Sequence, residues 1–133
     1  MEKKKKYFYA IGRRKNATAS VRIYPGGKGE LTVNGKDIKT YFMTPTLQAK
    51  IMEPFKKGGV DATYDITAMT KGGGINGQAE AVRHAITRAL VKEDEERRVG
   101  MKKLGLLKRD PRAKERRKFG LKKARKAPTW SKR

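Results

Sequence analysis

Apolar and polar residues alternate along several short stretches of this chain, and a period of two predicts strands with one buried face. The clearest stretch covers 17–24, where apolar Ala17, Ala19, Val21 and Ile23 are separated by Thr18, Ser20, Arg22 and Tyr24. The stretch 7–11 precedes it and is predicted to be its neighbour. A third alternation, at Leu31 and Val33, follows the turn-forming residues 25–29. The three stretches together predict an antiparallel meander.

A fourth strand is predicted over 60–68, where Val60, Ala62, Tyr64, Ile66 and Ala68 alternate with polar residues. The dipeptide Asn34-Gly35 closes the third stretch and is a turn signal. With helices packed on one face, these strands predict a small α+β domain.

Helical spacing appears in three places. Thr44-Pro45 is typical of a helix start, and Leu47, Ile51 and Phe55 then fall on one side of a helix that Pro54 is expected to end or kink. A longer helix is predicted around 79–90, with His84 and Arg88 on its polar side. A third runs from the acidic cluster 93–96 towards Lys103 and stops at Gly105.

Charge divides the chain into a domain over 1–107 and a tail over 108–133. The formal net charge is +22, and the tail alone holds thirteen basic and two acidic side chains. With so few apolar residues, the tail is expected to stay disordered until it binds a polyanion. Phe119, Leu121 and Trp130 interrupt its cations, which favours nucleic acid. Eight phosphate contacts would give a salt dependence of slope roughly −6 to −7.

Composition excludes several other classes of site. The chain has no cysteine and one histidine, which rules out a disulfide framework and a multi-histidine metal site. No stretch approaches the ~20 apolar residues of a membrane span, and a polybasic membrane anchor lacks a second attachment signal. We therefore expect a cytoplasmic protein, soluble when bound to its partner.

Two basic or glycine-rich segments are candidate binding sites. The segment 12–18 places three cations between two predicted strands, and 71–78 places glycines before a helix, where free N–H groups favour an anion. The second segment lacks the Gly-Lys-Ser/Thr of a phosphate-binding P-loop. Neither His84 nor the pair Asp61 and Asp65 makes a recognisable catalytic or metal site, so we expect no enzyme, no cofactor and no metal.

Three ordered blocks now identify a resemblance: "IGRRKNATASVRIYPGGKGELTVNGKDIKTYF", "KGGGINGQAEAVRHAITRAL" and "LLKRDPRAKERRKFGLKKARKAPTWSKR". From Ile11 onward the chain resembles universal small-subunit ribosomal protein nine in its bacterial form. The resemblance implies a fold like the second domain of ribosomal protein S five: a mainly antiparallel four-stranded sheet with helices on one face and a left-handed βαβ crossover. It departs at Thr129-Trp130, where glutamine and a smaller ring are usual, and in the lysine-rich residues 1–6.

The resemblance also implies partners and site residues. The partners are small-subunit rRNA, P-site tRNA and neighbouring small-subunit ribosomal proteins, with no membrane and no small-molecule substrate. The residues that match the rRNA-binding motifs are Gly12, Arg13, Arg14, Lys15, Lys71, Gly72, Gly73, Gly74, Gln78, Arg109, Arg112, Arg116, Arg117, Lys118, Lys122, Lys123, Arg125 and Lys126. Ser131, Lys132 and Arg133 match the end that approaches the anticodon stem-loop of P-site tRNA.

Two alternatives stay open at the level of sequence. Small-molecule kinases of the GHMP type share the implied fold and bind ATP at a glycine loop before a helix, so a phosphotransfer enzyme predicts nucleotide binding by residues 1–107. A histone-like DNA protein predicts dimerisation and comparable affinity for duplex DNA.

Overall fold

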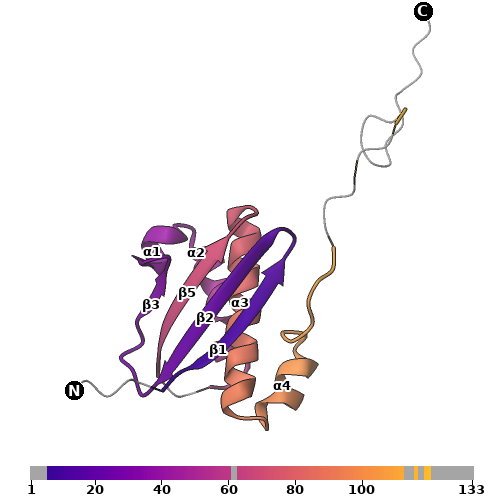
Figure 1. Ribbon diagram of the computed structural model, residues 1–133. Helices are drawn as coiled ribbons and strands as arrows, with labels where there is room; N and C mark the ends of the chain where they lie inside the picture. The colour runs from indigo at the N-terminus through magenta and orange to yellow at the C-terminus, as the bar shows by residue number, and fades with distance from the viewer. Residues whose placement is uncertain (1–5, 61–62, 113–115, 117–118, 121–133) are drawn as a thin grey trace, which may run out of the picture.

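The computed structural model describes residues 6–60, 63–112, 116 and 119–120 (Figure 1). The described residues form these elements: β1 (Phe8–Arg14), β2 (Ala17–Pro25), β3 (Leu31–Val33), β4 (Lys36–Asp37), α1 (Ile38–Tyr41), α2 (Pro45–Lys57), β5 (Tyr64–Lys71), α3 (Ile75–Glu93) and α4 (Arg97–Lys103). Parts of the tail and the lysine-rich N-terminal residues 1–5 lie outside the described residues. The expectation that the tail is disordered before it binds concerns those residues and stays a prediction.

The sheet is mixed, and its strand order is β1-β2-β5-β3-β4. The predicted three-strand meander is therefore wrong, because β5 lies between β2 and β3. β5 pairs antiparallel with β2 and parallel with β3, and α2 connects β3 to β5. The described residues hold a fifth strand, the two-residue β4, which the four-strand prediction lacks. Three of the four strand pairs are antiparallel, which agrees with a mainly antiparallel sheet. The left hand of the βαβ crossover stays a prediction.

One face of the sheet carries the core. Inward positions on β2 and β5, among them Val21, Ile23 and Ala68, are buried, whereas Thr18, Arg22 and Met69 on the other face are exposed. Helix α3 packs across β1 and β2 and beside α2. The alternation of apolar and polar residues thus becomes a covered face and an open face, as the predicted layer arrangement requires.

The helix ends are mostly as predicted. Thr44 is the N-cap of α2 and Pro45 its first residue. Pro54 does not end α2, because the helix continues to Lys57. The proline lies in the last turn and is buried against the core. After α4, Gly105 has φ +76°, and the amides of Gly105 and Leu106 donate to the carbonyls of Lys102 and Met101. This Schellman geometry ends the helix.

The alternation predicted over 60–68 is displaced in the structure. Strand β5 begins at Tyr64 and continues to Lys71, and residues 61–62 lie outside the described residues. The Asn34-Gly35 turn is confirmed: both residues have positive φ, and they connect the paired residues Val33 and Lys36. Two positive φ angles are what a type I′ hairpin turn requires.

Candidate nucleic-acid interface

The two predicted binding segments lie side by side at one end of the sheet. In the strand register, Arg13 of β1 is opposite Thr18 of β2, and Thr18 is opposite Lys71 of β5. All three side chains are exposed on the open face of the sheet. The β1–β2 turn, the glycine loop and the start of α3 share this end of the molecule (Figure 1). Segments almost sixty residues apart in sequence therefore combine into one basic surface.

The glycine loop packs closely against the β1–β2 turn. Gly72 and Gly73 have φ of +74° and +65°, a region that L side chains rarely adopt. A Cβ on Gly72 would lie 2.6 Å from the carbonyl oxygen of Asn16, and one on Gly73 would lie 2.9 Å from the amide nitrogen of Ala17. Both glycines are therefore needed for the loop to approach the turn. Gly74 is exposed, caps α3 and has open space beside it.

Gln78 braces this loop from inside the fold. Its Nε2 donates to the carbonyl oxygen of Gly72 at 3.1 Å, and its Oε1 accepts from the hydroxyls of Tyr41 at 2.5 Å and Thr70 at 3.4 Å. The side chain is half-buried. Gln78 thus holds the shape of the loop beside which Lys71 lies.

Gly12 lies in the covered layer rather than on the surface. A Cβ at this position would lie 2.1 Å from the carbonyl oxygen of Ala81 and 2.5 Å from the amide nitrogen of Ala85. Both atoms belong to the backbone of α3, so they can move only if the helix moves. Gly12 therefore sets the distance at which α3 crosses β1.

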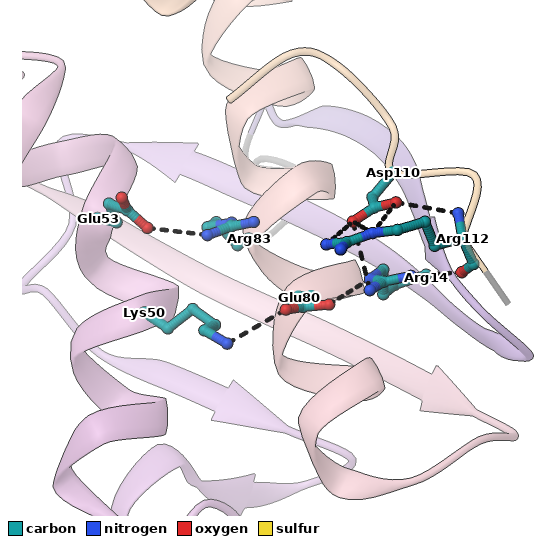
Figure 2. A network of polar contacts seen from close by, with 7 residues as sticks. All are labelled: Arg14, Lys50, Glu53, Glu80, Arg83, Asp110 and Arg112. Carbon is teal, nitrogen blue, oxygen red and sulfur yellow. Dashed lines mark hydrogen bonds and ion pairs between the residues drawn. The ribbon is translucent and has the colours of Figure 1, made fainter. Parts of the chain in front are cut away.

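Arg14 is only 9% exposed, although its neighbours Arg13 and Lys15 are open to solvent. Because side chains alternate along a strand, Arg14 points to the side of the sheet that α3 covers. Its Nε donates to Glu80 at 2.5 Å, its Nη1 donates to the carbonyl oxygen of Arg112 at 2.6 Å, and its Nη2 lies 3.3 Å from Asp110 (Figure 2). Arg14 thereby ties the beginning of the tail to the domain.

The network around Glu80 continues to the second helix. Lys50 of α2 donates to the other carboxylate oxygen of Glu80 at 3.2 Å, and Arg83 of α3 donates to Glu53 of α2 at 2.9 Å (Figure 2). Burial alone raises the pKa of Glu80, but the hydrogen bonds from Lys50 and Arg14 outweigh it and lower the pKa below 4.5. The carboxylate is thus charged at neutral pH and links α2, α3 and β1.

The described start of the tail runs from α4 back along α3 and β1 towards the basic end of the sheet (Figure 1). Asp110 accepts hydrogen bonds from the amide and the guanidinium of Arg112, and these hold the pKa of the Asp110 carboxyl well below its ordinary value. Arg109, Arg112 and Arg116 are exposed. The remaining predicted tail residues lie outside the described residues: Arg117, Lys118, Lys122, Lys123, Arg125, Lys126, Ser131, Lys132 and Arg133.

His84 corrects one expectation. Arg88 is exposed, as predicted for the polar side of α3, but His84 is half-buried and contacts the segment after α4. Its Nε2 donates to the carbonyl oxygen of Leu107 at 3.1 Å. Burial is the main cause that lowers the pKa of His84 below its ordinary value; the hydrogen bond to Leu107 opposes it, and the neighbouring cations lower the pKa further. A helical wheel could not reveal this contact, because Leu107 comes from a later segment that folds back over α3.

The described residues offer little for catalysis or metal binding. Among them, no three histidine or carboxylate side chains gather as a metal site would require. Within the same residues, no helix is long and apolar enough to span a membrane. What the surface does offer is a set of exposed cations on the open sheet face and beside it, which suits the phosphates of a nucleic acid.

Comparison with known families agrees with this surface. Residues 12–133 match the family model described as "Ribosomal protein S9/S16". Members of this family are RNA-binding structural proteins of the small ribosomal subunit, with rRNA and ribosomal proteins as partners, and they are not enzymes. The phosphotransfer alternative is therefore not retained. Because the match covers nearly the whole chain, the protein belongs to the ribosomal protein S9/S16 family.

Proposed function

We propose that this protein holds rRNA in the small-subunit head through two basic surfaces, the end of the sheet and the tail. The main observation behind the first surface is the strand register, in which Arg13, Thr18 and Lys71 lie opposite one another on three neighbouring strands. This register aligns two exposed cations, Arg13 and Lys71, across the open face of the sheet. Lys15, exposed at the turn, and the N–H groups that follow Gly74 add donors at the same end. These contacts position RNA through its backbone, without reading its sequence.

The proposed roles divide the predicted rRNA-binding residues by exposure. Arg13, Lys15, Lys71 and the exposed Gly72 to Gly74 backbone contact rRNA directly, as do Arg109, Arg112, Arg116 and the cations from 117 to 126. The three covered positions have positioning roles. Gly12 sets the distance between α3 and β1, Arg14 holds the start of the tail, and Gln78 braces the glycine loop. This assignment keeps each matched position in the interface and gives the covered ones a positioning role.

The C-terminal end takes a different partner in this proposal. Residues 131–133, which match the family's tRNA-approaching end, supply a hydroxyl and two cations to the backbone of the P-site tRNA anticodon stem-loop. A site that serves every tRNA needs contacts that ignore the anticodon sequence, and phosphate contacts meet that need. We further propose that the chain is the bacterial form and works in the cytoplasm, bound to the ribosome.

The sheet surface can be tested by neutralising its cations. We expect a variant carrying Arg13→Gln, Lys15→Gln and Lys71→Gln to bind a transcript of the cognate small-subunit rRNA with a salt slope smaller in magnitude by about 2–3. The equilibrium binding constant K is measured between 50 and 300 mM salt, and the slope is taken from a plot of log K against the logarithm of the salt concentration. Each lost phosphate contact reduces the magnitude of this slope by roughly 0.7–0.9.

A matched variant controls for net charge. Lys28→Gln, Lys36→Gln and Lys39→Gln remove three equally exposed charges from the far end and the opposite edge of the sheet. The proposal requires this variant to keep the wild-type slope. Equal losses in both variants would mean that rRNA responds only to total charge and would rule out a defined sheet surface.

A further inference from the structure

A cavity of about 370 Å³ lies at the free edge of β1. Strand β1 lines one side with Tyr9 and Arg13, α3 lines the other with His84, Arg88 and Lys92, and Arg109 closes it from the tail start. None of the described residues that line it is acidic. Four residues with a permanent positive charge therefore line one cavity without a carboxylate among them.

Two of these cations are held in place by the edge of the sheet. Arg88 Nη1 donates to the carbonyl oxygen of Ile11 at 2.5 Å, and Lys92 Nζ donates to the carbonyl oxygen of Tyr9 at 2.6 Å. These carbonyls lie on the side of β1 that faces away from β2. A guanidinium has five N–H donors and an ammonium three, so each cation keeps donors for a ligand after making one such bond. The side chains are oriented before a ligand arrives.

The adjacent small cavity, of about 40 Å³, shows the opposite charge balance. It shares Arg13, His84 and Arg109 with the larger one, but Glu80 and Asp110 also line it. There the carboxylates neutralise Arg14, as the ion pairs described above show. The larger cavity has cations of the same kind without that compensation, and this difference identifies it as the place for an external anion.

His84 lines the larger cavity, and its protonation would respond to an anion bound there. A carbonyl oxygen can only accept, so the bond to Leu107 puts the imidazole proton on Nε2 and leaves Nδ1 as an acceptor. Nδ1 is buried and has no hydrogen-bond partner within the described residues. Burial and the nearby Arg88, Arg83 and Arg109 disfavour the imidazolium. A bound anion would oppose those cations and favour protonation of His84.

We propose that this cavity is a binding site for a backbone phosphate of rRNA, held by Arg88 and Lys92 with Arg13 and Arg109 at its rim. The inference rests on the proposed rRNA binding and adds to it a site on α3 and the β1 edge, away from the glycine loop. The site binds the phosphodiester that RNA presents, and free inorganic phosphate shares its chemistry at lower affinity, because no neighbouring phosphates add contacts.

The first test uses the full-length protein with Arg88→Gln and Lys92→Gln together. Glutamine keeps a polar side chain with an N–H₂ donor while removing both charges. We expect the salt slope for the small-subunit rRNA transcript to fall in magnitude by about 1.4–1.8, with a roughly 25- to 60-fold loss of affinity near 0.1 M salt. The control pair Lys36→Gln and Lys39→Gln, at the opposite edge, should leave both quantities unchanged, and thermal unfolding verifies that each variant folds.

The second test follows the imidazole of His84 by NMR, and its assignment is immediate because the chain has a single histidine. We expect a single-stranded RNA decamer at saturation to raise the His84 pKa in the wild type but not in the Arg88→Gln, Lys92→Gln variant. Inorganic phosphate at millimolar concentration should give the same direction with a smaller shift. A shift with inorganic phosphate and none with RNA would mark a free-anion site and overturn the RNA assignment.

The outcomes separate this inference from the proposed function. If wild-type protein binds the transcript and the Arg88→Gln, Lys92→Gln variant keeps the same slope and affinity, the cavity is not a phosphate site, while rRNA binding stands. Equal losses in this variant and in its control would likewise overturn the site, because they report total charge. If wild-type protein shows no rRNA binding at all, the proposed function fails, and the phosphate site fails with it.

Discussion

At the scale of single residues, positions that resemble one another in sequence take opposite roles. Gly12, Gly72 and Gly74 all belong to matched binding motifs, yet only Gly74 has open space around it. Arg13 and Arg14 are adjacent, yet one is exposed and the other is buried among carboxylates. The cause is the strand geometry, which sends neighbouring side chains to opposite faces of the sheet.

Gly12→Ala tests the packing role of this residue. The added Cβ would lie 2.1 Å from the Ala81 carbonyl oxygen, so α3 must shift away from β1, and we expect the free energy of unfolding to fall by about 2 kcal/mol or more. Urea denaturation at neutral pH measures it. Gly100→Ala is the matched control, since nothing lies within 4 Å of its Cβ in the middle of α4. There alanine should stabilise by about 0.5–1 kcal/mol. Equal effects at the two positions would contradict the close approach.

At the scale of secondary-structure elements, one polar network joins elements that come from distant parts of the sequence. The Lys50–Glu80–Arg14–Asp110 chain of contacts links α2, α3, β1 and the tail start (Figure 2). Arg14 and Arg112 are 98 positions apart in the sequence. The network therefore holds the described start of the tail beside Arg14, at the basic end of the sheet.

Glu80→Gln tests this network through pH. The folded pKa of Glu80 is lowered, so its contribution to stability is present above pH 4.5 and is lost as the pH falls through the folded pKa. We expect the substitution to reduce the free energy of unfolding by about 1–3 kcal/mol at pH 7. The difference from wild type should shrink as the pH falls below 4.5.

Urea denaturation of both proteins from pH 7 down to pH 3 measures this difference. Glu95→Gln is the control, because Glu95 is exposed and is expected to change stability by less than about 0.5 kcal/mol at any pH. A Glu80→Gln effect that stays constant across the whole pH range would show that the carboxylate charge plays no part in the network.

At the scale of the whole molecule, the excess positive charge is divided between the domain and the tail. The sheet end belongs to the folded domain, and the edge cavity adds Arg109 from the start of the tail, whose thirteen basic residues begin at Lys108. We propose that most of these basic side chains contact rRNA phosphates and that only residues 131–133 contact tRNA. The two partners are then separable by truncation.

Removing residues 131–133 tests that separation. We expect small subunits to assemble with the truncated protein at near wild-type yield, because the remaining cations still neutralise rRNA phosphates. Affinity for P-site tRNA should fall by about 5- to 60-fold, the value of one or two phosphate contacts near 0.1 M salt. Filter binding of tRNA to purified subunits measures it, alongside Ser131→Ala, which keeps both cations. Unchanged tRNA binding and decoding fidelity in the truncated subunits would refute a tRNA role for the chain end.

The sequence by itself determined the local elements, the charge imbalance and the family. Alternation located β2, the Asn34-Gly35 turn and the start of α2, because those signals depend on residues within a few positions of one another. The order of the strands was decided only in the tertiary structure, because a period of two tells which face is buried and not which strand lies alongside. The same holds for Arg14, His84 and the cavity at the β1 edge. Their partners Asp110, Leu107 and Arg109 come from the far end of the chain, and only folding brings them together.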